Sequence, residues 1–364
     1  MEKFWDLIVI GGGPAGSTAA RYASSAGIKT LVLDRSKEIG HPLQCGELVP
    51  SNSQLEELCP NVPDIGDLIQ LSNSAISRTT DRLDLVTPSG KKLSYPFEGQ
   101  ILNRPIHDSE IADLAIKEGA IFHNNSTVVD IVANRVFLDN GDFFEGKVII
   151  GAGGPHDPLA RKYWNTNLTT VPVSFFLLEG HFDNNVEIHF GSMAPGGYAW
   201  VIPKKGGANI GVGVQPKFSN NYSVKEKADL FASKFPGEIV YRGGGVIPIS
   251  GPVQTMVKGN YLLVGDSAGT VFPSNGAGIS LAMISGRLAG QSVSEYIKYG
   301  TSLLSYQYNW KKQVGDNMKY SKRSFTLGKS LSYAPDWSIN MGFNNLTKPL
   351  LWRAITCQPI LGFF

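Results

Sequence analysis

The chain has few cysteines, and they follow no pattern that would bind a metal or form a disulfide framework. Only three occur among 364 residues, Cys45, Cys59 and Cys357, and none belongs to a C-x-x-C pair. This spacing excludes the usual zinc motifs and favours a reducing, intracellular environment. The six histidines also lack metal-ligand spacing, so no metal site is predicted.

Long apolar runs and a strong excess of basic charge are absent as well. No apolar run reaches the roughly 18 residues of a membrane span. A buried-strand pattern starts close to Met1 and leaves no room for a secretory signal peptide. The net charge is only +2 and no basic stripe carries interleaved aromatics, so nucleic acid is not an expected partner. We expect a cytoplasmic protein, and peripheral contact with the inner face of the cell membrane stays open.

Glycine, in contrast, is abundant, with 41 residues, and a first glycine-rich segment lies near the start of the chain. The apolar run Leu7–Ile10 predicts a buried parallel strand, and Gly11, Gly13 and Gly16 follow with the spacing G-x-G-x-x-G. The first glycine permits a tight turn, the second lets a pyrophosphate approach, and the third allows close packing of helix and strand. A helix that begins near Pro14 would direct its N-terminal amides at the phosphates.

The next predicted strand ends at Asp34, whose carboxylate can hold the ribose hydroxyls of an adenosine. The neighbouring Arg35 leaves a 2′-phosphate, and therefore NADP, open on these residues alone. A second glycine-rich segment, far along the chain, favours FAD. It consists of a buried strand over 261–265, Asp266 at its carboxyl end, and the glycines of 276–279, which would open another helix. The first amides of that helix could stabilise negative charge on a reduced isoalloxazine ring.

These patterns predict an α/β protein in which a Rossmann-like FAD-binding domain is interrupted by an antiparallel-sheet substrate domain. A hairpin pattern around Ser89-Gly90 and a run of strand patterns from 171 to 248 indicate the insertion, and helical patterns follow residue 280. The predicted FAD-binding domain comprises residues 1–70, 98–165 and 255–300. The substrate domain comprises 71–97 and 166–254, and a helical C-terminal region comprises 301–364.

Four segments carry a resemblance to a known family. They are Glu38–Glu47 with its Cys-Gly-Glu end, Pro195–Lys204 with a Tyr-x-Trp-x-x-Pro pattern, Gly243–Pro248, and Gly265–Ile279. Together they resemble FAD-dependent geranylgeranyl reductases, most closely the archaeal digeranylgeranylglycerophospholipid reductases, which belong to the flavoproteins built like para-hydroxybenzoate hydroxylase. The likeness covers residues 1 to about 300.

The resemblance implies reduction of isolated C=C bonds in geranylgeranyl chains of membrane lipid precursors, by hydride from reduced FAD and a proton. It implies flavin contacts at Ala15, Asp34, Cys45, Gly46, Leu48, Arg104, Val129, Asp266, Gly278 and Ile279, beside Gly11, Gly13 and Gly16. The proton donor stays open between Cys45, Tyr198, Glu47, a flavin-bound proton and water. Tyr198 and Trp200 share a strand face and could line a prenyl channel or simply fill the core.

The electron source stays open, because one carboxylate typical of related hydroxylases is missing. Those enzymes carry an Asp-Gly pair after the third strand, where this chain has Gly153-Gly154 and only later Asp157. The departure speaks against direct use of NADPH and is compatible with an external donor such as ferredoxin. A reduced nicotinamide remains the other candidate.

The apolar C-terminal stretch 339–364 allows two interpretations: a surface that touches the membrane, or a helix packed on the substrate domain or on a second subunit. Two other functions also remain. One is an FAD-dependent monooxygenase or halogenase of the same fold, and the other is a non-catalytic flavin-binding or electron-transfer protein.

Overall fold

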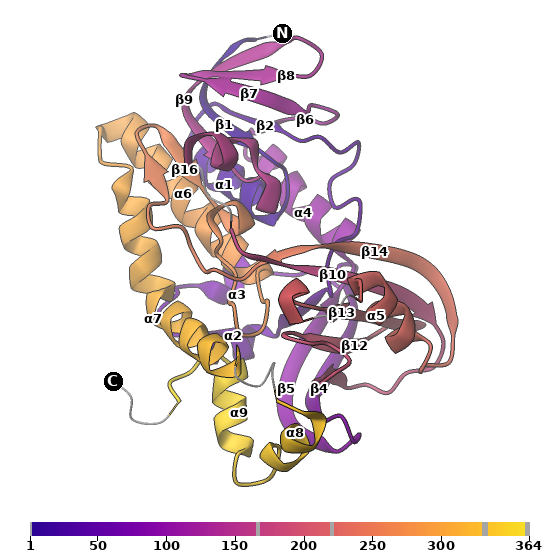
Figure 1. Ribbon diagram of the computed structural model, residues 1–364. Coiled ribbons are helices and arrows are strands. Elements are labelled where there is room, and N and C mark those ends of the chain that lie inside the picture. The colour runs from indigo at the N-terminus through magenta and orange to yellow at the C-terminus, as the bar shows by residue number, and fades with distance from the viewer. Residues whose placement is uncertain (1, 165–167, 219–221, 330–333, 361–364) are drawn as a thin grey trace.

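The computed structural model describes residues 2–164, 168–218, 222–329 and 334–360, which form two large β-sheets with helices around them (Figure 1). Each sheet has eight strands. Figure 1 shows the first sheet at the end of the molecule that holds the N-terminus, and the second sheet lower and to the right. Among the described residues, no helix combines the length and apolar content that crossing a membrane requires.

The first sheet is the predicted dinucleotide-binding sheet. Its main path runs β15-β16-β9-β1-β2-β6, and β7 and β8 extend it beside β9. The bounds are β1 Phe4–Ile10, β2 Thr30–Leu33, β6 Ile121–His123, β7 Val128–Val132, β8 Arg135–Leu138, β9 Phe143–Gly151, β15 Val257–Lys258 and β16 Tyr261–Leu263. Strands β1, β2, β6, β9 and β16 pair in parallel, and the apolar run of β1 is buried as its sequence predicts.

Two helices from distant parts of the chain pack closely beside this sheet. They are α1 (Pro14–Ser25) and α6 (Ile279–Tyr299). A Cβ added at Gly286 would lie 2.3 Å from the Ala15 carbonyl oxygen, and one at Gly290 would lie 2.5 Å from the Ala19 carbonyl oxygen. These glycines therefore let α6 approach the backbone of α1, and the two glycine-rich segments meet.

The second sheet has the order β14-β10-β13-β12-β11-β4-β5-β3. Its bounds are β3 Leu48–Pro50, β4 Ile76–Val86, β5 Lys92–Leu102, β10 Thr170–Glu179, β11 Val186–His189, β12 Tyr198–Lys204, β13 Gly207–Gly213 and β14 Glu238–Pro248. All pairs are antiparallel except β4 and β11, which are parallel. The exception arises because these two strands are separated by a long stretch of chain and are not joined by a hairpin.

Both faces of the second sheet are covered, because alternate side chains enter two different cores. Phe175 and Trp200 belong to the core that faces the C-terminal helices, whereas Phe176 and Val201 pack beneath α5 (Val224–Ala232). The remaining helices are α2 (Asn52–Leu58), α3 (Ile65–Leu68), α4 (Arg104–Lys117), α7 (Leu304–Gly328), α8 (Asp336–Gly342) and α9 (Lys348–Ile355). Short helical turns occur at Gly154–His156, Ala160–Trp164, Pro216–Phe218 and Gly265–Ala268.

The predicted fold class is confirmed: a Rossmann-like sheet is interrupted by a second sheet, and helices follow residue 280. The second sheet includes β3 near the start of the chain, and its strand β5 continues to Leu102. Of the C-terminal apolar residues, Phe343 is buried and Leu351, Trp352 and Ile355 pack against the second sheet's core. Leu361, Phe363 and Phe364 lie outside the described residues.

Candidate functional site

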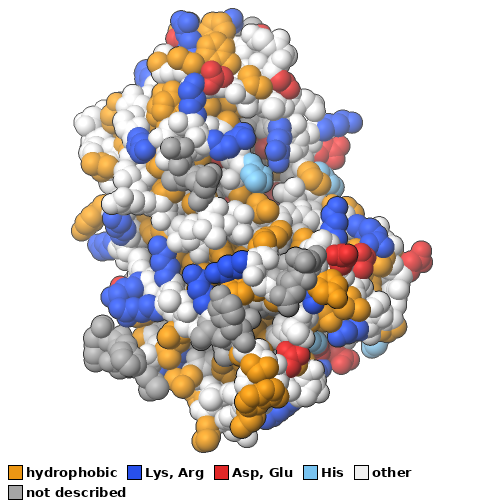
Figure 2. Space-filling model, in the orientation of Figure 1, with side chains coloured by type: hydrophobic (Ala, Val, Ile, Leu, Met, Phe, Trp, Pro, Cys, Tyr) orange, Lys and Arg blue, Asp and Glu red, His pale blue; other side chains and the backbone are white. Residues whose placement is uncertain are grey.

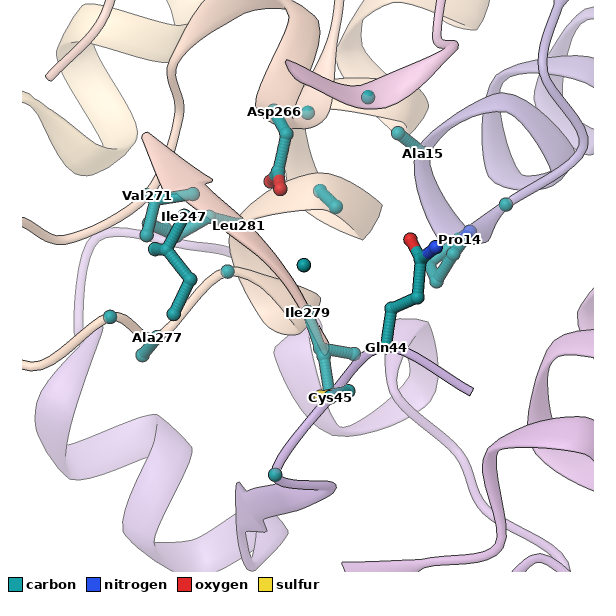
Figure 3. A pocket seen from close by; sticks show the side chains of 18 of the residues that line it. Pro14, Ala15, Gln44, Cys45, Ile247, Asp266, Val271, Ala277, Ile279 and Leu281 are labelled. Carbon is teal, nitrogen blue, oxygen red and sulfur yellow. The ribbon is translucent and has the colours of Figure 1, made fainter. Parts of the chain in front are cut away.

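A cavity of about 630 Å³ lies where the two glycine-rich segments, the Cys45 loop and the second sheet meet. Figure 3 shows Pro14 and Ala15 from α1, Asp266 and Ile279 from the second glycine-rich segment, and Cys45 facing this space. Most of the exposed lining is apolar, and the second sheet supplies Phe175, Tyr198 and Trp200 to it. The cavity therefore joins a phosphate-binding turn to an apolar wall.

The three glycines of the first turn have three different surroundings. Gly11 adopts a φ of +103°, and an added Cβ would lie 2.5 Å from the Ala152 carbonyl oxygen. A Cβ at Gly16 would lie 1.9 Å from the Gly11 carbonyl oxygen, so α1 packs directly on the turn. A Cβ at Gly13 would meet no heavy atom within 4 Å and would project into open space.

The N-terminus of α1 is suited to an anion. Its N-cap is Gly13, which provides no side-chain hydrogen bond, and the first turn holds no acidic residue. The first backbone amides of α1 therefore have no capping side chain and are available to a ligand in the cavity. Asp34 lies beside them and accepts hydrogen bonds from the backbone N–H groups of Gly12 and Ser36, each at 2.7 Å. These two bonds hold the Asp34 carboxylate beside the glycine turn.

The second glycine-rich segment brings the carboxylate of Asp266 to the cavity. Asp266 follows β16, and no side chain among the described residues hydrogen-bonds its carboxylate. Burial raises the pKa of Asp266 to about 6, and Arg104 acts in the opposite direction. Helix α6 begins nearby at Ile279 with Gly278 as its N-cap, again with no side-chain cap and no acid in the first turn.

Cys45 lies where the two glycine-rich segments meet the second sheet, and its sulfur accepts a hydrogen bond from the backbone N–H of Glu47 at 3.1 Å. Burial raises the pKa of the Cys45 thiol, while the positive charge of Arg104 and the Glu47 N–H oppose the shift. The group is therefore a protonated thiol at neutral pH, and the Glu47 N–H and the Arg104 charge would both stabilise its conjugate thiolate.

Arg104 is held by a buried acid on the same helix. Its guanidinium donates to both oxygens of Asp108, at 2.8 and 2.7 Å, and His107 Nδ1 lies 2.8 Å from the same carboxylate. Although burial opposes its charged form, Arg104 and His107 lower the pKa of Asp108 to about 2. Asp108 thus stays ionised and keeps the Arg104 charge beside Cys45.

The other two candidates for proton donation have different partners. Glu47 is 1% exposed, and its carboxylate forms an ion pair with Lys204 at 2.5 Å. The Tyr198 hydroxyl donates to the Asn275 carbonyl oxygen at 2.5 Å, and burial raises its pKa to about 12. Both groups are already engaged by these structural partners, so Cys45 is the strongest of the three candidates.

A second cavity of about 600 Å³ adjoins the first and shares Tyr198, Trp200 and Ile247 with it. Its far side is lined by Ile339 of α8, by Phe343 directly after α8, and by other residues of the C-terminal helices. The sequence did not predict this cavity. The helices that enclose it are distant in the chain from the strands that they cover.

The structure brings together nearly all of the residues that the sequence singled out. The cavity lining includes Gly11, Gly13, Ala15, Asp34, Cys45, Gly46, Glu47, Leu48, Arg104, Tyr198, Trp200, Asp266, Gly278 and Ile279. Two lie apart from it. Gly16 serves the packing of α1, and Val129 has a side chain that is 56% exposed while its neighbour Val128 lines the cavity. Gln44 also lines the cavity; it belongs to the Glu38–Glu47 segment but was not singled out as a site residue.

The geometry fits FAD. The N-termini of α1 and α6 face one cavity, and neither has a side-chain cap. Gly13 leaves open space in front of α1, and the Asp34 carboxylate, which could bind a ribose, lies beside it. The buried Asp266 carboxylate, with no side-chain hydrogen bond of its own, suits the hydroxyl groups of a ribityl chain. These features belong to an FAD-dependent flavoprotein with a Rossmann-like domain.

Comparisons with known proteins give the family. Residues 172–246 match the family model "Geranylgeranyl reductase catalytic domain", and residues 9–48 match "NAD(P)-binding Rossmann-like domain". Digeranylgeranylglycerophospholipid reductase 3 of Methanosphaera stadtmanae is 33% identical over 80% of this chain and 78% of its own. The Methanocaldococcus jannaschii digeranylgeranylglycerophospholipid reductase is 30% identical over 88% of this chain and 87% of its own. The chain belongs to this geranylgeranyl reductase family.

Solved structures agree with that assignment. A geranylgeranyl bacteriochlorophyll reductase-like protein from Thermoplasma acidophilum has a TM-score of 0.81 and 25% identity, and the match covers 94% of this chain and 91% of that protein. A flavin-dependent brominase has a TM-score of 0.70 at 15% identity, with 97% and 94% of the two chains covered. The second similarity shows a shared fold alone.

The raised pKa of Asp266 predicts a pH-dependent stability. Between pH 4 and pH 6 the unfolded chain loses the Asp266 proton while the folded chain keeps it, so the folded state loses stability as the pH rises. Asp266→Asn should therefore stabilise the FAD-free protein by about 1–2 kcal/mol at pH 7 and have little effect at pH 4. Urea unfolding at both pH values measures this difference. An equal effect at the two values would contradict it.

Proposed function

We propose that this protein is a flavin-dependent reductase that hydrogenates isolated C=C bonds of geranylgeranyl chains in membrane ether-lipid precursors. One observation carries the proposal. The Cys45 thiol lies in one cavity between the two glycine-rich segments, which suit FAD, and the apolar side chains of the second sheet. The names of the relatives supply the substrate class. The discontinuous FAD-binding domain and the substrate domain, with the limits given above, are part of this proposal.

The cofactor contacts follow from the lining. Gly11, Gly13 and Ala15 would hold the pyrophosphate, and Asp34 the adenosine ribose. Gly46, Leu48, Arg104, Asp266, Gly278 and Ile279 would surround the flavin end. Val129 would contribute through its backbone, since its side chain is exposed. Reduced FAD supplies a hydride when it is bound.

The protein's own residues supply the proton and a dry cavity. An isolated alkene has no carbonyl to take up charge, so a proton must reach one carbon as hydride reaches the other. The Cys45 thiol holds that proton, and Arg104 and the Glu47 N–H stabilise the thiolate that remains. Tyr198 and Trp200 present apolar ring surface to the chain and exclude water.

An external electron carrier such as ferredoxin is the donor that the turn after β9 favours, with a reduced nicotinamide as the alternative. Gly153 and Gly154 line the cavity where related hydroxylases carry an acid. Asp157 does not replace that acid. Its carboxylate is fully buried and accepts hydrogen bonds from the backbone N–H groups of Gly153 and Ala160, at 2.7 and 2.8 Å.

The reductase is tested by its product. The purified protein, reduced anaerobically with dithionite and given a geranylgeranyl lipid, should yield a lipid heavier by about two mass units for each double bond reduced. Mass spectrometry of the extracted lipid measures this gain. Incorporation of oxygen or halide under air with NADPH would instead support the monooxygenase or halogenase. Absence of any product, with intact flavin, would support an electron-transfer protein.

The substrate would enter from the membrane past α8. Ile339 and Phe343 face the second cavity, whereas Trp337, Met341 and the nearby Leu346 are 65%, 70% and 90% exposed. Figure 2 shows apolar side chains gathered at this end of the molecule. Exposed lysines of α7, among them Lys311, Lys312 and Lys319, could attract anionic lipid.

The membrane contact can be measured by vesicle sedimentation. Replacing Trp337, Met341 and Leu346 together by serine should weaken binding to anionic phospholipid vesicles by about 100-fold or more, because each buried apolar side chain contributes about 1.5–3 kcal/mol. Phe4→Ser is the matched control, since Phe4 is 67% exposed on β1 in the other sheet. If the triple variant and the control sediment alike, α8 does not touch the membrane.

A further inference from the structure

The loop that carries Cys45 contains a residue in an unfavourable backbone conformation. Glu47 has a φ of +70°, in the left-handed region that residues with a Cβ rarely adopt. The Glu47 N–H donates to the Cys45 sulfur, 3.1 Å away, and the positive φ turns the chain that follows Glu47 into β3. This backbone conformation costs free energy, so nearby contacts must stabilise the loop that contains it.

A buried ion pair supplies that contact. Lys204 Nζ lies 2.5 Å from Glu47 Oε2 and also donates to the Leu102 carbonyl oxygen at 3.0 Å. The Asn209 side-chain amide donates to Glu47 Oε2 at 3.3 Å and to the Cys45 carbonyl oxygen at 2.9 Å. The Glu47 carbonyl oxygen in turn accepts from the Leu102 N–H at 2.8 Å. Both ends of the Cys45–Glu47 loop are thus fixed to the second sheet.

The partners on the second sheet follow a simple pattern along β12. Tyr198, Trp200, Ile202 and Lys204 alternate and so share one face of the strand. Tyr198 and Trp200 line the cavity, and the Trp200 ring N–H donates to Asn209 Oδ1 at 2.9 Å. Lys204 is the last residue of this row, and its side chain pairs with Glu47. One strand face therefore forms the apolar wall and also holds the loop of the proton donor.

We propose that the Glu47–Lys204 pair is a positioning device that holds the Cys45–Glu47 loop, with Glu47 in its left-handed conformation, in the turn in which the Glu47 N–H donates to the Cys45 sulfur. Glu47 and Lys204 are positioning residues here, since they act through Cys45 and not on the substrate. The inference rests on the proposed function for its importance, because the N–H stabilises the thiolate left after proton donation. Of the residues that the structure describes, Arg104 and Tyr198 also interact electrostatically with this sulfur, and Asp108 holds Arg104 in place.

Two double variants that differ by a single Cβ test the proposal. Glu47→Gly with Lys204→Met removes the pair but leaves a glycine, which adopts a positive φ without strain. Glu47→Ala with Lys204→Met removes the same charges but adds the Cβ that disfavours this φ. The measurement is the rate of Cys45 alkylation by iodoacetamide at pH 8 in the FAD-loaded protein, followed by peptide mass spectrometry.

The glycine variant should react within about twofold of the wild-type rate, and the alanine variant about tenfold more slowly, because losing one donor raises the thiol pKa by about one unit. Equal rates in the two variants would overturn the proposal. Flavin absorbance and thermal unfolding check that both variants fold. If neither folds, the pair serves the fold and not the loop, and the proposal is wrong. Since no lipid or electron donor is present, the result stands whether or not the protein reduces prenyl chains.

Discussion

Replacing Cys45 by serine is expected to lower the rate of alkene reduction by about 100- to 10,000-fold while FAD stays bound. The reason is the environment of the sulfur. Burial keeps the thiol protonated, and Arg104 and the Glu47 N–H are placed to stabilise the thiolate after proton donation. A serine hydroxyl has nearly the same size but is a far weaker acid, so the proton transfer fails and the cavity stays intact.

The measurement is a single-turnover assay of lipid reduction in protein whose FAD has been reduced beforehand with dithionite. Flavin absorbance of the oxidised variant confirms that the cofactor is retained. Cys357→Ser is the matched control, because Cys357 also lines the cavity but is surrounded by the polar side chains of Ser274 and Asn275. A Cys45→Ser variant that reduces lipid at the wild-type rate would show that the proton comes from elsewhere.

Alanine at Gly13 and alanine at Gly16 are expected to damage different properties of the protein. Gly13 has a φ of −70° and a ψ of −174°, which alanine adopts freely, and its Cβ would point into the open cavity. Gly13→Ala should therefore fold normally but bind FAD about 100-fold more weakly, a loss of about 2.7 kcal/mol, because the methyl group occupies the path of the pyrophosphate.

Gly16→Ala should instead destabilise the fold itself. Its Cβ would lie 1.9 Å from the Gly11 carbonyl oxygen, so α1 must move away from the turn, at a cost of about 3 kcal/mol. Thermal unfolding of the FAD-free proteins and titration with FAD separate the two effects. If FAD-free Gly13→Ala unfolds as early as Gly16→Ala, the assignment of separate roles to the two glycines is wrong.

Much of the first sheet could be predicted because its signals are local. The apolar run of β1, the spacing of Gly11, Gly13 and Gly16, and the acid that follows β2 each depend on a few neighbouring residues. The same holds for the hairpin of β4 and β5, whose turn residues are Ser89 and Gly90. Here the local preference and the final fold agree.

The candidate site was predicted only in part, because its members come from many segments. The motifs marked Cys45, Asp266 and Tyr198, but they did not show that Tyr198 donates to a backbone carbonyl or that Glu47 is paired. Lys204 and Gln44 lay within the segments that carry the family resemblance, but nothing in the sequence marked their contacts. Asn209 carried no local signal, since its hydrogen bonds cross from the second sheet to the Cys45–Glu47 loop.

The sequence by itself determined the cofactor class and the family, because glycine positions with fixed backbone requirements and motif residues are written directly in the chain. Only the tertiary structure decided which candidate groups are already engaged in structural contacts, and where a second cavity lies. The physical reason is that burial, ion pairing and the direction of an N–H are set by residues that are distant in the chain. Glu47 illustrates this most clearly: its sequence context allowed an acid catalyst, and the packing of β12 made it an anchor.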